Sequence, residues 1–118
     1  MDEKTFKART KKLAVTIIKE VEKPPRSLAA DTIGRQLIRS GTSISANYRA
    51  ACRAKSSADM INKMKIVEEE SDETQYWLEL LVEAGLVPQN QITNIYKETD
   101  EILAMTVASI KTLRTRKS

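Results

Sequence analysis

Residues 31–54 read DTIGRQLIRSGTSISANYRAACRA, and this stretch decides the fold of the chain. Its apolar and small residues recur every three or four positions, at Ile33, Leu37, Ser40, Ile44, Tyr48 and Ala51. This spacing places them on one face of an α-helix, so we predict a helix over about residues 27–54 with Ser27 as its N-cap. The segment 41–45 has low helix propensity, and a kink there is the alternative to one continuous helix.

Three other segments, at about residues 2–23, 57–84 and 89–116, repeat the helical spacing. The helix breakers fall between the segments, at Pro24, Pro25, Gly85 and Pro88. We predict Ser57 as the N-cap of the third helix, and Gly85 as the left-handed residue that follows it, with Leu86 folding back toward Leu81. No segment alternates as strands do, so the predicted fold is all-α: an elongated, antiparallel up-down-up-down four-helix bundle that occupies residues 1–118 as one domain.

The composition excludes several classes of site. The chain has no histidine, which removes the commonest general base and the commonest metal ligand. We therefore predict a protein that is not an enzyme, with no catalytic residues, no metal and no cofactor. Cys52 is the single cysteine, no apolar run approaches the length of a membrane span, and the N-terminus lacks the apolar core of a secretory signal. These features predict a cytoplasmic protein with no membrane partner.

Charge is unevenly distributed along the sequence. The formal charges of residues 1–26, 27–65, 66–104 and 105–118 are +4, +5, −9 and +4, which gives the net +4 of the chain. Oppositely charged regions of this kind can pair between copies and leave a basic face free. The pattern predicts a self-associating protein with a polyanionic partner.

Arginines form a stripe on the predicted second helix, opposite its apolar face. At about 100° per residue, Arg35 and Arg53 point the same way, and Arg39 and Arg49 fall about 40° to either side. We interpret this stripe as a candidate phosphate-binding surface, extended by the N-terminal lysines Lys4, Lys7, Lys11 and Lys12. A subunit interface and a plainly solvated face are the two alternatives.

The acidic cluster of the third segment raises a metal hypothesis, because acidic side chains recur there at helical spacing: Glu68, Glu69, Glu70, Asp72 and Glu73. Di-iron bundles combine such glutamates with histidines, which this chain lacks. Most of the cluster flanks the apolar seam and is expected to face outward. We therefore favour an acidic surface for a basic partner, which includes a second copy of the chain.

Two stretches carry a family resemblance. Residues 36–51, QLIRSGTSISANYRAA, and residues 65–81, KIVEEESDETQYWLELL, followed by EAGL at 83–86, resemble the four-helix bundle proteins also called 23S ribosomal RNA intervening-sequence proteins or S23 ribosomal protein-like. The resemblance implies a left-handed antiparallel bundle and a ring-like homopentamer. Related members, the accessory proteins of diversity-generating retroelements, use a basic pentamer surface to bind nucleic acid and a reverse transcriptase. A glutamate that commonly follows Asn-Tyr-Arg in the family is replaced here by Ala50.

Together, the residues and the resemblance predict a non-enzymatic, oligomeric nucleic-acid-binding accessory protein, with RNA as the expected nucleic acid. The alternative is a protein-interaction scaffold whose basic and acidic faces dock subunits or a partner protein such as a reverse transcriptase. In that case the arginines would be engaged in contacts with other subunits or with the partner protein.

Overall fold

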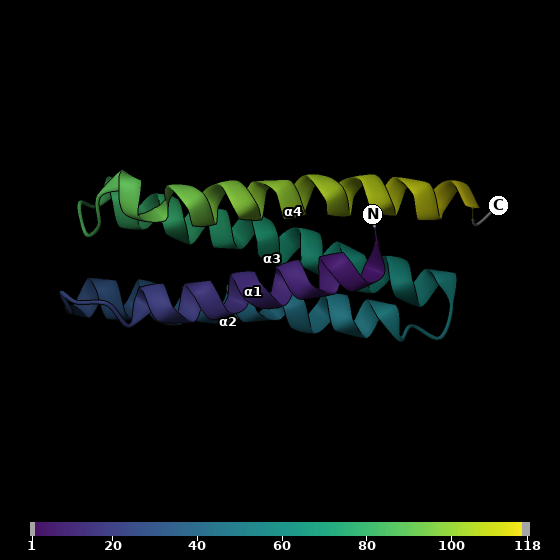
Figure 1. Cartoon of the computed structure of the whole chain (residues 1–118), viewed down its shortest axis with the longest axis horizontal. Coiled ribbons are helices and arrows are strands. Elements are labelled where there is room, and N and C mark those ends of the chain that lie inside the picture. The colour runs from purple at the N-terminus through teal and green to yellow at the C-terminus, as the bar shows by residue number, and fades with distance from the viewer. Residues whose placement is uncertain (1, 117–118) are drawn as a thin grey trace.

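Four helices account for most of the chain: α1 (Glu3–Val21), α2 (Leu28–Cys52), α3 (Ser57–Glu83) and α4 (Gln89–Arg116). The computed structural model of the protein describes residues 2–116, and no strand occurs within them. Consecutive helices run antiparallel and are joined by short loops (Figure 1). The bundle measures 50 × 21 × 19 Å, so the prediction of an elongated all-α four-helix bundle is confirmed.

Helix α2 is continuous through residues 41–45, and the kink that their low propensity allowed does not occur. Glycine has a packing role here. A Cβ atom at Gly41 would lie 2.6 Å from Cδ1 of Ile17, and one at Gly34 would lie 2.8 Å from Cγ1 of Val21. The two glycines, seven residues apart, therefore let α2 approach α1 closely along one seam.

The helix ends follow known capping chemistry. Ser27 accepts a hydrogen bond from the backbone N–H of Ala30, which confirms it as the N-cap of α2. The N-cap of α3 is Ser56 rather than the predicted Ser57, because the Ser56 hydroxyl is the one that accepts from the N–H of Asp59. Gly85 has φ +72°, as predicted for the residue after α3.

The turn after α3 is a Schellman motif. The N–H of Leu86 donates to the carbonyl of Leu81, and the N–H of Gly85 donates to that of Val82. The backbone at Leu86 thus folds back on the last turn of α3, as the sequence predicted, and the chain enters α4 antiparallel to α3.

The core lies along the predicted seams and combines large apolar side chains with buried hydroxyls. Phe6, Ile17, Leu37, Ile44, Met64, Val67, Leu78 and Ile102 are at most 1% exposed. Most buried hydroxyls bond to a carbonyl of their own helix, and Thr74 also donates to Ser40 at 2.9 Å, which links α3 to α2. No helix within residues 2–116 is long and apolar enough to cross a membrane.

Among neighbouring helices, α2 and α3 have the most extensive contact, and α1 and α4 have the least extensive. Ion pairs join α1 to α4: Arg9 donates to Glu98 at 2.6 Å and to Glu101 at 2.9 Å. These bonds raise the pKa of the Arg9 guanidinium above its ordinary value. The backbones of α1 and α3 do not approach each other closely, and neither do those of α2 and α4, so the α1–α2 face and the α3–α4 face lie on opposite sides of the bundle.

Candidate nucleic-acid interface

The contact between α1 and α2 sets which charged residues come together. The rings of Phe6 and Tyr48 meet edge to face with centroids 4.6 Å apart, and Ile17 packs against Gly41. The N-terminal half of α1 therefore lies along the C-terminal half of α2. The predicted lysines of the first segment and the last two arginines of the second share this end of the bundle.

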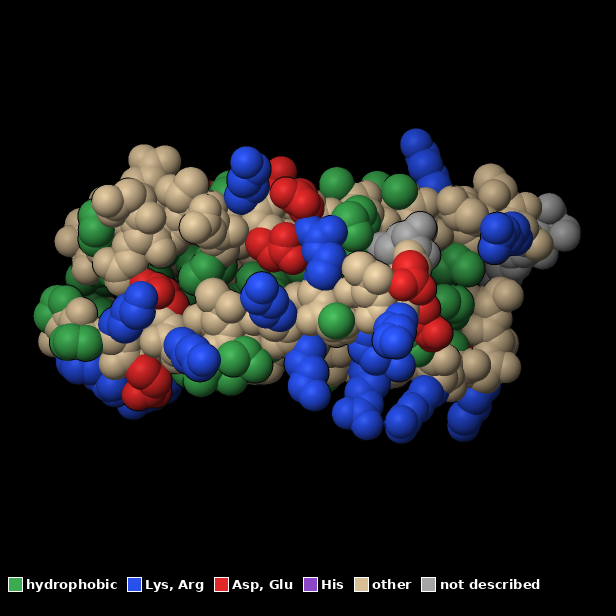
Figure 2. Space-filling model, viewed as in Figure 1, with side chains coloured by type: hydrophobic (Ala, Val, Ile, Leu, Met, Phe, Trp, Pro, Cys, Tyr) green, Lys and Arg blue, Asp and Glu red, His purple; other side chains and the backbone are tan. Residues whose placement is uncertain are grey.

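Five exposed cations form what we call the basic face: Lys4, Lys7, Lys11, Arg49 and Arg53. Lys7 lies near Cys52 of α2: burial raises the pKa of the Cys52 thiol, and the positive charge of Lys7 partly offsets this rise. Lys4 and Lys11 lie on the same side of α1 because they are three and four residues from Lys7. Figure 2 shows Lys and Arg side chains projecting along the edge made by these halves of α1 and α2.

None of the five cations forms an ion pair within the part of the chain that the structure describes. Glu3 and Asp59 lie beside the basic face, but neither carboxylate is bonded to it. The Asp59 carboxylate accepts a hydrogen bond from the backbone N–H of Lys55 at 3.2 Å, where it helps to cap α3. The guanidinium and ammonium groups of the basic face are therefore available to an external anion.

A shallow hollow of about 700 Å³ borders the basic face at the corner between α2 and α3. Arg49 and Arg53 line it together with Lys55 and Lys63. These two lysines were not among the predicted site residues. Lys55 stands two residues beyond Arg53, which was a usable signal, whereas Lys63 comes near only because α3 folds back on α2.

Arg39 lies on the predicted stripe but is neutralised within the chain. Its guanidinium donates to Glu70 of α3 at 3.0 Å and forms a second ion pair with Glu73. The Arg39 bond holds the pKa of the Glu73 carboxyl below its ordinary value, and the Trp77 indole N–H donates to the same carboxylate at 3.2 Å. Two of the five acids of the predicted acidic cluster thus have an intramolecular basic partner.

The other two predicted cations, Arg35 and Lys12, stand apart from the basic face. Arg35 is exposed and has no ion pair within residues 2–116. It is 14 residues before Arg49, which corresponds to roughly 21 Å along the helix. Lys12 lines a groove on the other side of α1 with Arg9 and Glu98. The structure therefore brings together five of the eight predicted residues.

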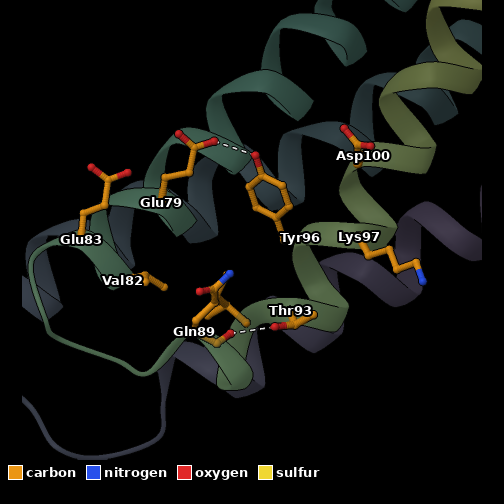
Figure 3. A pocket seen from close by; sticks show the side chains of 9 residues that line it. Glu79, Val82, Glu83, Gln89, Thr93, Tyr96, Lys97 and Asp100 are labelled. Atoms are coloured by element: carbon orange, nitrogen blue, oxygen red, sulfur yellow. Dashed lines mark hydrogen bonds between the residues drawn. The ribbon is translucent and has the colours of Figure 1, made fainter.

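A second cavity, of about 620 Å³, lies between the end of α3 and the start of α4 and has the opposite charge. Its rim carries Glu79 and Glu83 from α3 and Asp100 from α4, and the Tyr96 hydroxyl donates to Glu79 at 2.7 Å (Figure 3). Val82 contributes an apolar wall, and Lys97 points away from the acids. Such a surface repels phosphate and attracts cations.

Two titratable groups beside the contact between α1 and α2 are shifted by burial. Burial raises the pKa of both Tyr48 and Cys52, so each stays protonated near neutral pH. Within residues 2–116, no group of three or more acidic or cysteine side chains is placed to hold a metal ion.

The fold and this charge pattern define the class as a small helical-bundle protein with a cationic face. Residues 4–108 match the family model of the 23S rRNA-intervening sequence protein, so the chain belongs to this family. A protein of unknown function from the S23 ribosomal protein family of Bacteroides thetaiotaomicron VPI-5482 has a similar solved structure, with a TM-score of 0.83 and 35% identity. The match covers 94% of this chain and 99% of that one. No curated protein matches the sequence.

Proposed function

We propose that this chain is a non-enzymatic accessory protein of the bacterial cytoplasm that binds nucleic acid, RNA above all, through its basic face. The observation that carries the proposal is the convergence of Lys4, Lys7, Lys11, Arg49 and Arg53 from two helices, without acidic partners in the described chain. Cations that neutralise phosphates release condensed counterions, and this release supplies sequence-independent affinity. Phosphate contacts position a nucleic acid without reading its bases, so binding should have little sequence preference.

Self-association belongs to the same proposal. The basic face and the acidic rim of Glu79, Glu83 and Asp100 lie on opposite sides of the bundle. A contact between these two surfaces would cover the cations that bind phosphate, so we place the subunit contacts of a head-to-tail ring away from the basic face. The resemblance to retroelement accessory proteins makes the pentamer the expected ring.

The test is a fluorescence anisotropy titration of a labelled structured RNA at several salt concentrations. The variant Arg49→Glu/Arg53→Glu removes two cations of the basic face. Its matched control, Lys97→Glu/Lys111→Glu, makes the same change in net charge at exposed positions of α4. We expect the wild-type affinity to fall steeply with salt, the first variant to lose at least about 100-fold in affinity, and the control to stay within about threefold.

Two outcomes would overturn the proposal. The first is an absence of RNA binding at low salt. The second is equal loss in the two variants, because that would mean that only the net charge matters. Circular dichroism and the molar mass in solution must be the same for both variants, so that unfolding or dissociation does not imitate a lost contact.

A second candidate function, a scaffold that docks subunits or a partner protein such as a reverse transcriptase, is favoured by one specific observation. The acidic cavity has an apolar wall at Val82 and Ile92, a combination that suits a basic amphipathic segment of another protein. If the arginines act at subunit contacts, Arg49→Glu/Arg53→Glu will lower the molar mass in light scattering, and the wild type will not bind RNA.

A further inference from the structure

We propose that the basic face binds double-stranded nucleic acid, by contacting phosphates of both strands, and discriminates against single strands. This inference rests on the proposed function and names the substrate class of the same face. It comes from two features of the structure: where the aromatic rings lie, and how the cations are arranged on α1 and α2.

The aromatic residues are not placed to bind a single strand. Proteins that hold single strands without sequence preference stack the bases on exposed aromatic rings inside a cationic groove. Phe6 is 0% exposed and Tyr48 is 4% exposed, and they pack against each other under the basic face. The remaining three rings, Tyr76, Trp77 and Tyr96, belong to α3 and α4, where Trp77 and Tyr96 donate hydrogen bonds to glutamates. The basic face therefore offers no ring on which a base can stack.

The cations are arranged in two rows rather than in one track. Lys4, Lys7 and Lys11 run along α1 for roughly 10 Å, and Arg49 and Arg53 span roughly 6 Å along α2. Axes of packed helices are about 8–10 Å apart, and long side chains add reach to each row. This separation lies between the widths of the two grooves of a B-form duplex, about 6 and 12 Å. Each row can thus reach the phosphates of one strand.

The scaffold that carries the two rows is rigid, which also favours a duplex. The rows are fixed to each other by the Phe6–Tyr48 contact and by the close approach of Ile17 to Gly41. A duplex presents its two phosphate rows already ordered, whereas a flexible single strand must lose conformational freedom to match a fixed pattern of cations. Both rows run along the sides of helices, so the backbone of the nucleic acid is what we expect the face to recognise.

The experiment compares three probes that carry similar numbers of phosphates: an RNA duplex of about 16 base pairs, a DNA duplex of the same sequence, and an oligouridylate of about 32 nucleotides. Anisotropy is recorded for the whole chain between 50 and 200 mM salt. We expect each duplex to bind at least about tenfold more tightly than oligouridylate. If all five cations contact phosphates, the logarithm of the duplex affinity should fall with the logarithm of the salt concentration at a slope of roughly −4.5. The duplex affinity should then decrease about 500-fold over this range of salt.

Two variants separate the two-row arrangement from general charge. Lys4→Gln/Lys7→Gln/Lys11→Gln removes the α1 row and should reduce the preference for duplex to within about twofold. Ala46→Trp places a ring at an exposed position beside Arg49 and should raise the affinity for oligouridylate at least about fivefold without changing that for the duplexes.

The outcomes distinguish this inference from the proposed function. Oligouridylate that binds as tightly as either duplex would overturn the inference and leave nucleic-acid binding intact. A duplex preference that survives removal of the α1 row would also overturn it. Failure of all three probes to bind at 50 mM salt would overturn the inference and the proposed function together. The two duplexes serve as arms that tell whether the face prefers the A-form or the B-form.

Discussion

The middle of α2 and its C-terminal end carry the same residue type on the same side of one helix, yet the two regions have different surroundings. In the middle, Arg39 is bonded to Glu70 and Glu73 of α3, while Gly41 touches Ile17 of α1. At the C-terminal end, Arg49 and Arg53 are exposed and form no ion pair among the described residues. The neighbouring helix decides the difference, because α3 presents Glu70 and Glu73 beside the middle of α2 and Lys63 beside its end.

The comparison teaches that a charged stripe on a helix is not one surface. The middle of α2 is fixed by contacts to both neighbouring helices, so we assign it to stability. At the end, Arg49 and Arg53 form no ion pair with the described residues of either neighbouring helix, so we assign them to binding. The following four changes test this division, beginning with the largest expected effect.

Gly41→Val should destabilise the protein by about 1–3 kcal/mol, because the new side chain enters space that Ile17 fills. The measurement is the free energy of unfolding from urea titration. Ala46→Val is the matched control, since it introduces valine at an exposed position of the same helix and should cost only the difference in helix propensity, about 0.5 kcal/mol. Equal costs for the two variants would mean that the α1–α2 seam is not tightly packed at Gly41.

Arg49→Ala/Arg53→Ala should weaken binding to structured RNA about tenfold and make the salt slope shallower by roughly two, because two phosphate contacts are lost. Arg39→Ala is the control on the same helix and should change the affinity by less than about twofold, since its guanidinium is already paired. Both are measured by fluorescence anisotropy. A larger loss from Arg39→Ala than from the double variant would reverse our division of α2.

Glu70→Gln/Glu73→Gln should strengthen RNA binding about threefold. The double variant releases Arg39 and removes two negative charges of α3 that lie beside α2. Glutamine keeps the length of each side chain and an acceptor for the Trp77 indole. The control Glu79→Gln/Glu83→Gln makes the same charge change on the α3–α4 face and should have a smaller effect. Similar gains in both variants would show that overall charge, rather than the release of Arg39, is responsible.

Arg39→Ala should lower the free energy of unfolding by less than about 1 kcal/mol, because the ion pairs are partly exposed to solvent. The effect should depend on pH. Arg39 lowers the pKa of folded Glu73 below its ordinary 4.5, so the added stability is present above that value and is lost as the pH falls through the folded pKa. In urea titrations, the difference between the wild type and the variant should therefore be smaller at pH 3 than at pH 7. An equal difference at the two pH values would mean that Arg39 acts by packing instead.

Much of the fold was predictable because periodic apolar spacing and breakers act locally. The four helices, the Ser27 cap and the left-handed Gly85 followed from residues near each other in the sequence. The glycines were harder to interpret. Propensity alone made Gly41 a point of weakness in α2, whereas the structure shows it as the place where α1 approaches. The N-cap of α3 was missed by one residue because Ser56 and Ser57 are chemically equivalent in sequence.

The candidate site was predictable only in part. Helical angles grouped the arginines correctly on one side of α2, but they carried no information about which residues of α3 face them. Arg39 was therefore included although it is paired within the chain, and Lys63 was missed although it lines the hollow beside Arg49 and Arg53. Lys12 was grouped with the other N-terminal lysines, and the structure places it on the α4 side of α1.

The sequence by itself determined that this chain forms four amphipathic helices, and it contains the motifs by which the chain resembles the family of 23S rRNA-intervening sequence proteins. These properties depend on local periodicity, capping and turn residues, which need no knowledge of distant contacts. The tertiary structure alone decided which charges remain free, because an ion pair depends on the register between helices. The register between α1 and α2 is set by the Phe6–Tyr48 contact and the glycine seam, and that between α2 and α3 by the Ser40–Thr74 bond. This register leaves one end of α2 basic and neutralises its middle.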